Sequence, residues 1–201
     1  MLRAVVCFWE GKNVIWYRIG ESLVHTESAV PADVPALVLL TTEELEKRPI
    51  LPGLESVLEH TPAVRGARFC RAEARSGCLS GTLVLPRRGK DGVRAAFGLL
   101  VTQNRVVLTD DSASLAPMLH RIAQEKRWTR GTVGQVLHDF FEELIARDLR
   151  RLEELEEQAE SLEDLVLADG VESAGGRMNA LRKETMALYR YYSQLDDVAC
   201  G

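Results

Sequence analysis

The chain has 201 residues, 46% of them hydrophobic, and a formal net charge of −5 at pH 7. This length and composition suit one ordinary globular domain with an extension, and the acidic balance argues against nucleic-acid binding. No apolar run reaches the roughly 18 residues that a membrane-spanning helix needs, and the run at residues 1–9 is too short for a signal peptide. The sequence therefore predicts a cytoplasmic, soluble piece.

The first 128 residues predict an α+β or α/β domain built on a mixed, largely antiparallel sheet of about seven strands. Residues 3–9 and 14–19 are β-favouring runs around a polar turn, which suits a hairpin. Residues 36–40 form an unbroken apolar run, which predicts a strand buried on both faces. Further on the hydrophobic period changes to two. The strands predicted there are 67–74, 79–85, 94–102 and 105–108.

Three helices are predicted within this domain. Thr41 and Glu44 form a capping box for a short helix, and residues 53–60 predict a second short helix. Asp111 or Ser112 then begins a helix that runs to about Arg127. Its apolar residues share one face, so we expect it to cover the sheet.

Residues 129–201 predict a long antiparallel helical hairpin. Thr132 and Gln135 form a capping box, and about ten helical turns follow, without proline. A loop containing Gly170, Gly175 and Gly176 is expected to separate this helix from a second one.

Both helices carry a heptad seam that predicts coiled-coil contact between them. The first seam is interrupted only by the polar residue Asp148. Its members are Phe141, Ile145, Asp148, Leu152, Leu155, Ala159, Leu162 and Val166, and those of the second are Met178, Leu181, Thr185, Leu188, Tyr192, Leu195 and Ala199.

No set of residues predicts catalysis, so we expect no enzyme and assign no catalytic or cofactor-binding residue. The four histidines lack the spacing of a metalloprotease pair, and no phosphate-binding loop or nucleophile elbow is present. The four cysteines have no zinc-binding spacing and are predicted to be reduced and partly buried. These residues are His25, His60, His120, His138, Cys7, Cys70, Cys78 and Cys200.

An acidic run on the first long helix has two interpretations. Its carboxylates could collect Mg²⁺ weakly, because hard cations prefer oxygen ligands, or they could form only a solvated helix face. The run comprises Glu153, Glu154, Glu156, Glu157, Glu160, Glu163 and Asp164.

Two adjacent aspartate pairs also have structural and functional interpretations. Asp110 and Asp111 are expected to cap a helix, and Asp196 and Asp197 are expected to face solvent, because adjacent side chains point apart. A cation site at a subunit interface is the functional alternative for either pair.

Three segments resemble CorA-type divalent-cation transporters. Residues 97–108, a strand, a polar turn and a strand, are similar to the last hairpin of that family's cytoplasmic sheet. Residues 138–157 resemble its long acidic helix, and residues 179–190 its returning helix. The resemblance implies an α/β sandwich, long helices that form a funnel in a homopentamer, and two C-terminal membrane helices.

The sequence departs from this family in two ways. The Gly-Met-Asn pore motif is absent, and Arg177-Met178-Asn179 begins an amphipathic helix, so a pore would have to lie beyond Gly201. Residues 58–65 lack an acidic pair that the family often shows, so no metal ligand is transferred and the metal-binding residues stay unknown.

The leading hypothesis is a cytoplasmic regulatory domain of a CorA-like magnesium or divalent metal ion transporter. It would sense cytosolic Mg²⁺ or another weakly bound divalent cation and gate a pore beyond residue 201. The alternative is a soluble coiled-coil scaffold or interaction protein with an α/β head.

Overall fold

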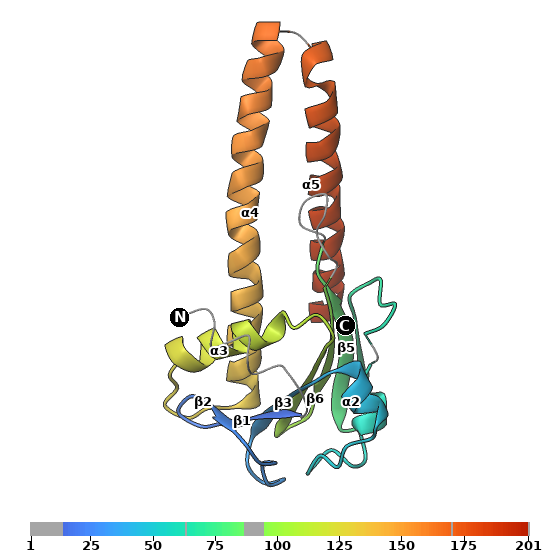
Figure 1. Cartoon of the computed structure of the whole chain (residues 1–201), viewed down its shortest axis with the longest axis vertical. Helices are drawn as coiled ribbons and strands as arrows, with labels where there is room; N and C mark the ends of the chain where they lie inside the picture. The colour runs from blue at the N-terminus through green and yellow to red at the C-terminus, as the bar shows by residue number, and fades with distance from the viewer. Residues whose placement is uncertain (1–13, 63, 87–94, 170, 201) are drawn as a thin grey trace.

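The computed structural model describes residues 14–62, 64–86, 95–169 and 171–200. The chain forms a head, built on one sheet, and a stalk, built from two long antiparallel helices (Figure 1). Among the described helices, none combines the length and the apolar content needed to span a bilayer.

The head contains one seven-stranded sheet in the order β2-β1-β3-β7-β6-β5-β4. Only β3 and β7 pair in parallel, so the predicted mixed, largely antiparallel sheet is confirmed. The strands are β1 Ile15–Ile19, β2 Leu23–Thr26, β3 Ala36–Leu40, β4 Arg71–Arg75, β5 Cys78–Val84, β6 Ala96–Val101 and β7 Arg105–Asp110.

The first strands of the sheet are not all the ones that the sequence predicted. β2 was not predicted, because it has only four residues and follows β1 after a tight turn closed by the hydrogen bond from Gly20 N to Ser22 O (3.1 Å). β1 pairs with β2 on one side and with β3 on the other. The strand predicted at residues 3–9 lies outside the described residues.

Two apolar cores lie on the two faces of the sheet. Leu37 and Leu39 of β3 point into the core that α3 (Leu115–Glu125) and the start of the stalk cover. Val38 and Leu40 point into the opposite core, where Leu54 packs. Every residue of β3 is buried, which confirms the strand predicted to be buried on both faces.

The short helices of the head are only partly as predicted. The Thr41–Glu44 capping box is confirmed at the start of α2 (Thr42–Glu46). The helix predicted at residues 53–60 is wrong, because this segment consists of turns with one 3₁₀ helix, η1 (Leu58–His60). Gly53 adopts φ +80°, a left-handed conformation that cannot continue an α-helix.

The stalk consists of α4 (Val133–Asp169) and α5 (Val171–Cys200), as the predicted helical hairpin requires. The capping box is also confirmed, with Thr132 Oγ1 accepting from Gln135 N at 3.2 Å. The predicted loop is wrong at Gly175 and Gly176, which lie inside α5, and Gly170 lies outside the described residues. A glycine inside a helix costs about 1 kcal/mol of helix stability relative to alanine. The hydrogen bonds and packing of the rest of α5 outweigh this cost.

The predicted seam joins the two stalk helices only in part. Leu155, Leu162 and Leu188 are buried in it, whereas Ile145 and Met178 are exposed. Asp148, the polar member, is also buried, and Tyr192 donates to its Oδ2 at 3.4 Å.

The stalk is attached to the head at both of its lower ends. Gly131 lies so close to Gly20 O that a Cβ there would approach within 2.0 Å, and Trp128 N donates to Glu21 O at 2.7 Å. At the end of α5, Gln194 Oε1 accepts from Cys70 N at 2.9 Å. The hairpin is therefore held by the β1–β2 turn and by the residue just before β4.

Arg105, the first residue of β7, is 1% exposed and binds the loops around it. Among the described residues its guanidinium donates only to backbone carbonyls, and its Cζ lies 5.9 Å from the centre of the Trp16 ring. Burial lowers the pKa of Arg105, while Asp33 and Glu55 act in the opposite direction. The acceptors are the carbonyl oxygens of Pro52 (3.0 Å), Val30 (3.1 Å), Pro31 (2.5 Å), Asn104 (3.1 Å) and Val34.

Arg105→Met should therefore destabilise the head strongly. The substitution leaves several buried carbonyls without a donor, so we expect the free energy of unfolding in urea to fall by about 3 kcal/mol. Arg105→Lys, which keeps the charge but has fewer donors, should lie in between. Arg18→Met, on the exposed side of β1, is the matched control, and an Arg105→Met midpoint equal to that of the control would contradict this role.

Candidate functional site

The acidic pair at the end of β7 organises two helix starts. Asp110 is fully buried, and its Oδ2 accepts from Leu115 N, the first residue of α3, at 2.8 Å. Its Oδ1 accepts from Ser112 N at 2.7 Å and from Ser112 Oγ at 2.6 Å. Asp111 Oδ1 accepts from Thr42 N, the first residue of α2, at 2.7 Å. Both carboxylates are thus engaged with backbone N–H groups of the head, as the capping interpretation predicts.

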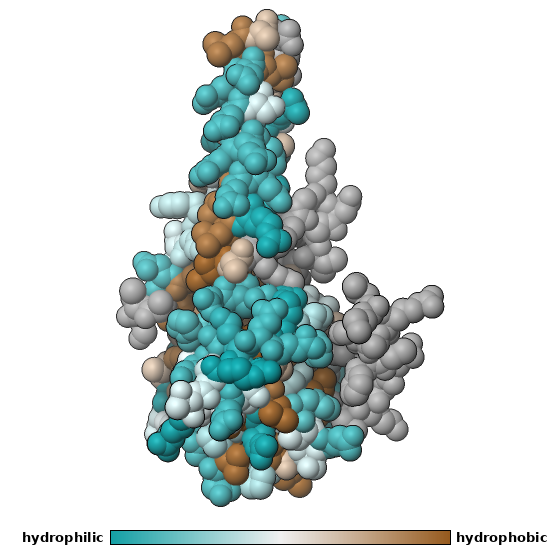
Figure 2. Space-filling view, turned by 90° about the vertical axis from the view of Figure 1, so that its left-hand side faces the viewer, coloured by the Kyte–Doolittle hydropathy of each residue, from teal (hydrophilic) through white to brown (hydrophobic). Residues whose placement is uncertain are grey.

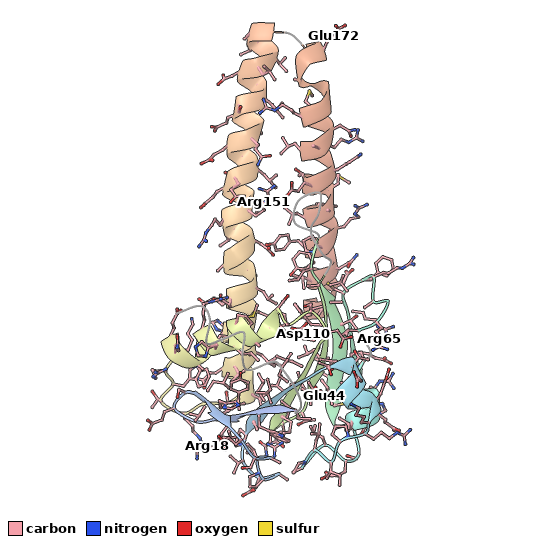
Figure 3. The ribbon with its side chains drawn as sticks, viewed as in Figure 1. Arg18, Glu44, Arg65, Asp110, Arg151 and Glu172 are labelled. Atoms are coloured by element: carbon pink, nitrogen blue, oxygen red, sulfur yellow. The ribbon has the colours of Figure 1, made fainter. Side chains whose placement is uncertain are left out.

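The acidic run on α4 is exposed along its whole length. Glu154 pairs with Arg151 at 2.5 Å, and Arg151 also binds Glu184 of α5 at 2.6 Å, between the two helices (Figure 3). These two carboxylates raise the pKa of Arg151. Within the described residues no ion pair is found for Glu153, Glu156, Glu157, Glu160, Glu163 or Asp164.

Part of this run lies along one stripe of α4. Glu153, Glu157, Glu160 and Asp164 step by four, three and four residues, so they project from the same side of the helix. The stripe concentrates negative charge without bringing several oxygens to one point, which is what a tight cation site requires.

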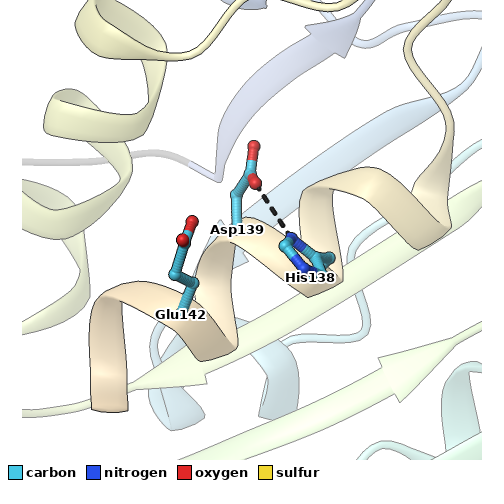
Figure 4. Close-up of side chains that lie close together, drawn as sticks. All are labelled: His138, Asp139 and Glu142. Carbon is cyan, nitrogen blue, oxygen red and sulfur yellow. Dashed lines mark hydrogen bonds and ion pairs between the residues drawn. The ribbon is translucent and has the colours of Figure 1, made fainter. Parts of the chain in front are cut away.

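A cluster of possible metal ligands lies near the start of α4, where none was predicted. The ligand atoms of His138, Asp139 and Glu142 lie within 4.8 Å of one another (Figure 4). Asp139 is buried, whereas the His138 side chain is 75% exposed. The spacing of one and four residues on a predicted helix is the sequence signal that could have indicated this cluster.

The bonds of this cluster indicate a structural role. Asp139 Oδ2 accepts from the Trp128 indole N–H at 2.9 Å, and its Oδ1 lies 3.2 Å from His138 Nδ1. The Lys126 ammonium lies 2.5 Å from Glu142 Oε2 and 3.9 Å from Asp139 Oδ1. The hydrogen bond to Glu142 raises the pKa of Lys126. A cationic side chain therefore already occupies the place where a metal ion would be attracted.

The remaining histidines and cysteines form no second cluster in the described part of the chain. His25 makes an edge contact with Tyr17, and His120 lies 2.9 Å from Gln124. Cys70 and Cys78 are reduced thiols, as predicted, and both are buried, where the prediction was partial burial. Cys7 and the side chain of Cys200 lie outside the described part.

The other predicted candidates are on the stalk or near it. Asp196 and Asp197 are exposed on α5, as predicted. Arg177, Met178 and Asn179 lie within the same helix. Of residues 58–65, Leu58–His60 form η1 and Arg65 lies in a turn, while residue 63 lies outside the described part.

Two grooves run between α4 and α5. The larger one, about 680 Å³, is mostly apolar, with Leu162, Val166 and Leu167 of α4 facing Met178 and Met186 of α5. Glu163 and Arg182 lie at its rims. The second groove, about 540 Å³, is more polar and includes Glu157 and Arg177. The stalk thus has an apolar side and a polar side.

The sequence matches no protein-family model, and no curated protein matches it. Solved structures do share its fold. The soluble domain of CorA from Methanocaldococcus jannaschii superposes with a TM-score of 0.68 at 20% identity, over 91% of this chain and 76% of that one. The complete CorA magnesium transporter of the same organism gives a TM-score of 0.68 at 18% identity, over 94% of this chain and 62% of that one.

A third solved structure agrees with these two. The ZntB cytoplasmic domain from Vibrio parahaemolyticus RIMD 2210633 gives a TM-score of 0.61 at 15% identity, over 88% of this chain and 72% of that one. The head and the hairpin together therefore have the fold of a CorA-type cytoplasmic domain, which confirms the resemblance seen in the sequence. The chain spans 62% of the length of the complete CorA transporter.

Asp110→Asn should cost more stability than Asp111→Asn. Both carboxylate oxygens of Asp110 accept hydrogen bonds, so in asparagine the NH₂ group would face a backbone N–H. We therefore expect the free energy of unfolding to fall by about 2 kcal/mol. Asp111 accepts with one oxygen only, and asparagine keeps that oxygen. Urea unfolding of the two variants measures the difference. Equal losses would contradict the capping assignment.

Proposed function

We propose that this chain is the cytoplasmic domain of a CorA-like transporter of Mg²⁺ or another divalent cation. It would act together with membrane helices outside these 201 residues and assemble as a homo-oligomer, with a pentamer expected for the full-length protein. The observation that carries this proposal is the superposition of head and stalk together, over 94% of the chain, on the complete CorA transporter. The proposal assigns no enzymatic reaction to the chain.

The regulatory part of the proposal rests on the exposed carboxylates of α4 that form no ion pair within the described residues. A row of exposed carboxylates attracts divalent cations weakly and repels a second such row on a neighbouring copy. Cytosolic Mg²⁺ would reduce that repulsion and favour one packing of the stalks, while loss of Mg²⁺ would favour another. The cation thus biases the pore through its different affinity for the two arrangements.

A scaffold is the second candidate function. The exposed apolar side of the stalk favours it, because such a surface is typical of a site for another protein. In that case the head would bind an unrelated partner, and no membrane segment would be involved.

Cell fractionation distinguishes the two candidates. An antibody against the α4–α5 hairpin should detect the natural gene product in the membrane fraction, where it resists a salt wash and is released by detergent. A product found in the supernatant after removal of membranes would favour the scaffold and contradict the transporter.

Mg²⁺ should stabilise the chain through the carboxylate stripe. At a concentration a few times the dissociation constant we expect about 1 kcal/mol, or a rise in Tm of about 3 °C, relative to NaCl of the same ionic strength. Changing Glu153, Glu157, Glu160 and Asp164 together to their amides should remove this rise. Asp196→Asn with Asp197→Asn is the control, and an unchanged rise in the amide variant would contradict cation binding at the stripe.

A further inference from the structure

Phe69, just before β4, is an aromatic residue that the fold holds in place without burying it. Its carbonyl oxygen accepts from Thr82 Oγ1 at 3.0 Å, and the N–H of the next residue, Cys70, donates to Gln194 Oε1 at 2.9 Å. The side chain of Phe69 is nevertheless 64% exposed. An aromatic side chain on a fixed backbone loses little conformational entropy when a partner covers it, so this position suits a protein contact.

A small apolar patch lies on α4 just above the head. It consists of Ile145 and Leu149, which are one helical turn apart and are 39% and 55% exposed. We call these two residues the α4 patch. Figure 2 shows hydrophobic surface on the stalk just above the head and hydrophilic surface above that. The α4 patch ends below this hydrophilic surface, so it is one compact surface.

Phe69 and the α4 patch lie at about the same height along the stalk. Tyr192 of α5 donates to Asp148 of α4, so residue 192 of α5 is level with residue 148 of α4. Cys70 belongs to one apolar cluster with Tyr191, and Tyr192 packs against that cluster. Phe69, which precedes Cys70, is therefore level with the segment of α4 that carries the patch.

The two surfaces lie on opposite sides of the plane through α4 and α5. The α4 patch is rotated by roughly 100° around its helix from Leu155, a buried residue that faces α5. The midpoint of Tyr191 and Gln194, which contact Cys70, is rotated by roughly 90° around α5 from Leu188, which faces α4. Seen from the head, both rotations are clockwise from the direction of the other helix. They therefore lead to opposite sides of the hairpin.

The charges beside the two surfaces are opposite in sign. Arg68 and Arg71 flank Phe69 in the chain, and both are exposed. Glu153 and Glu156 follow the α4 patch by one and two helical turns on the same side of the helix, and both are exposed. Phe69 thus has basic flanks, whereas the upper end of the α4 patch is acidic. Two surfaces of this kind attract each other when they belong to different copies.

We infer that Phe69 of one copy packs against the α4 patch of the next copy, with the stalks parallel. Each copy then places its Phe69 on one neighbour and receives Phe69 from the other, so two different surfaces meet. Such a contact is not two-fold, and its repetition closes into a ring, as a homopentamer requires. The matching height of the two surfaces lets every copy in the ring stand at the same level.

This inference deepens the proposed function, since it rests on the expected homo-oligomer and names the two surfaces by which copies meet. Parallel stalks also suit copies that share one membrane. Its test traps contacts between copies of the 201-residue chain and does not measure membrane association. A chain that fractionates with membranes but fails the trapping test would refute this contact alone, so the two can fail separately.

Disulfide trapping tests the contact directly. Phe69→Cys and Leu149→Cys are introduced together into the 201-residue chain, in a background with Cys7→Ser and Cys200→Ser, because the other two native thiols are buried. After mild oxidation we expect a ladder of covalent oligomers that extends beyond two chains on a non-reducing gel. Phe69→Cys with Leu167→Cys is the matched control and should give at least tenfold less ladder, since Leu167 is 85% exposed but lies near the tip of the stalk.

The single variants show whether the contact joins two different surfaces. An equimolar mixture of the Phe69→Cys chain and the Leu149→Cys chain should give covalent dimers and nothing larger, because each chain has only one of the two thiols. Either chain alone should stay monomeric on the gel. Covalent dimers from one single variant alone would indicate a two-fold contact, and a double variant with no more ladder than the control would indicate no contact. Either result would overturn the inference.

Charge reversal tests the flanks of the contact. Adding Arg68→Glu with Arg71→Glu to the trapping variant should reduce the ladder at least fivefold, and so should adding Glu153→Arg with Glu156→Arg. All four changes together should restore the ladder, because the opposite charges then meet again with their signs exchanged. Circular dichroism shows whether each variant keeps its helices. A combined variant that traps no better than the separate reversals would contradict the pairing of these surfaces.

Discussion

The arrangement of the head depends on a guanidinium that has no carboxylate within hydrogen-bonding distance in the described structure. Arg105 is held by carbonyl oxygens from the loops on both sides of β3 and by its own neighbour, so the charge is spread over peptide dipoles. These bonds fix one end of β7, and Asp110 at the other end fixes the start of α3. From α3 the chain reaches α4 through Trp128, which binds Asp139. The stalk is thus placed by a series of contacts that begins inside the sheet.

Acidic residues serve two different purposes in this molecule. Asp110 and Asp111 of the head, and Asp139 and Glu142 in the first turns of α4, are bound to backbone N–H groups, an indole or an ammonium, and have little capacity left for a cation. Those in the middle of α4 are exposed and mostly without ion pairs. Carboxylates of this second kind attract cations from solution, because their charges are not already balanced by a neighbouring group.

Much of the fold was predictable, because local signals were strong. Capping boxes at Thr41 and Thr132 located two helices, and the period-two segments located the later strands. The sequence did not reveal β2, whose four residues are stabilised by pairing with β1. It also did not reveal that residues 53–60 form turns and a 3₁₀ helix, which begin at Gly53 in a left-handed conformation. The His138 cluster needed the helix to bring residues together, and its structural role needed Lys126 and Trp128 from outside that helix.

The parallel pairing of β3 with β7 also constrains the order in which the head can form. Strands β4 to β7 are a meander of neighbours, and α4 with α5 is a local hairpin, so both can form with short loop closures. β3 cannot form its parallel pairing until β7 has been synthesised, which happens about 65 residues later on the ribosome. Until then β3 can pair with β1 but lacks a partner on its other side, and the nascent chain exposes an apolar strand edge prone to aggregate. Synthesis therefore passes through a vulnerable interval that ends only when β7 has emerged.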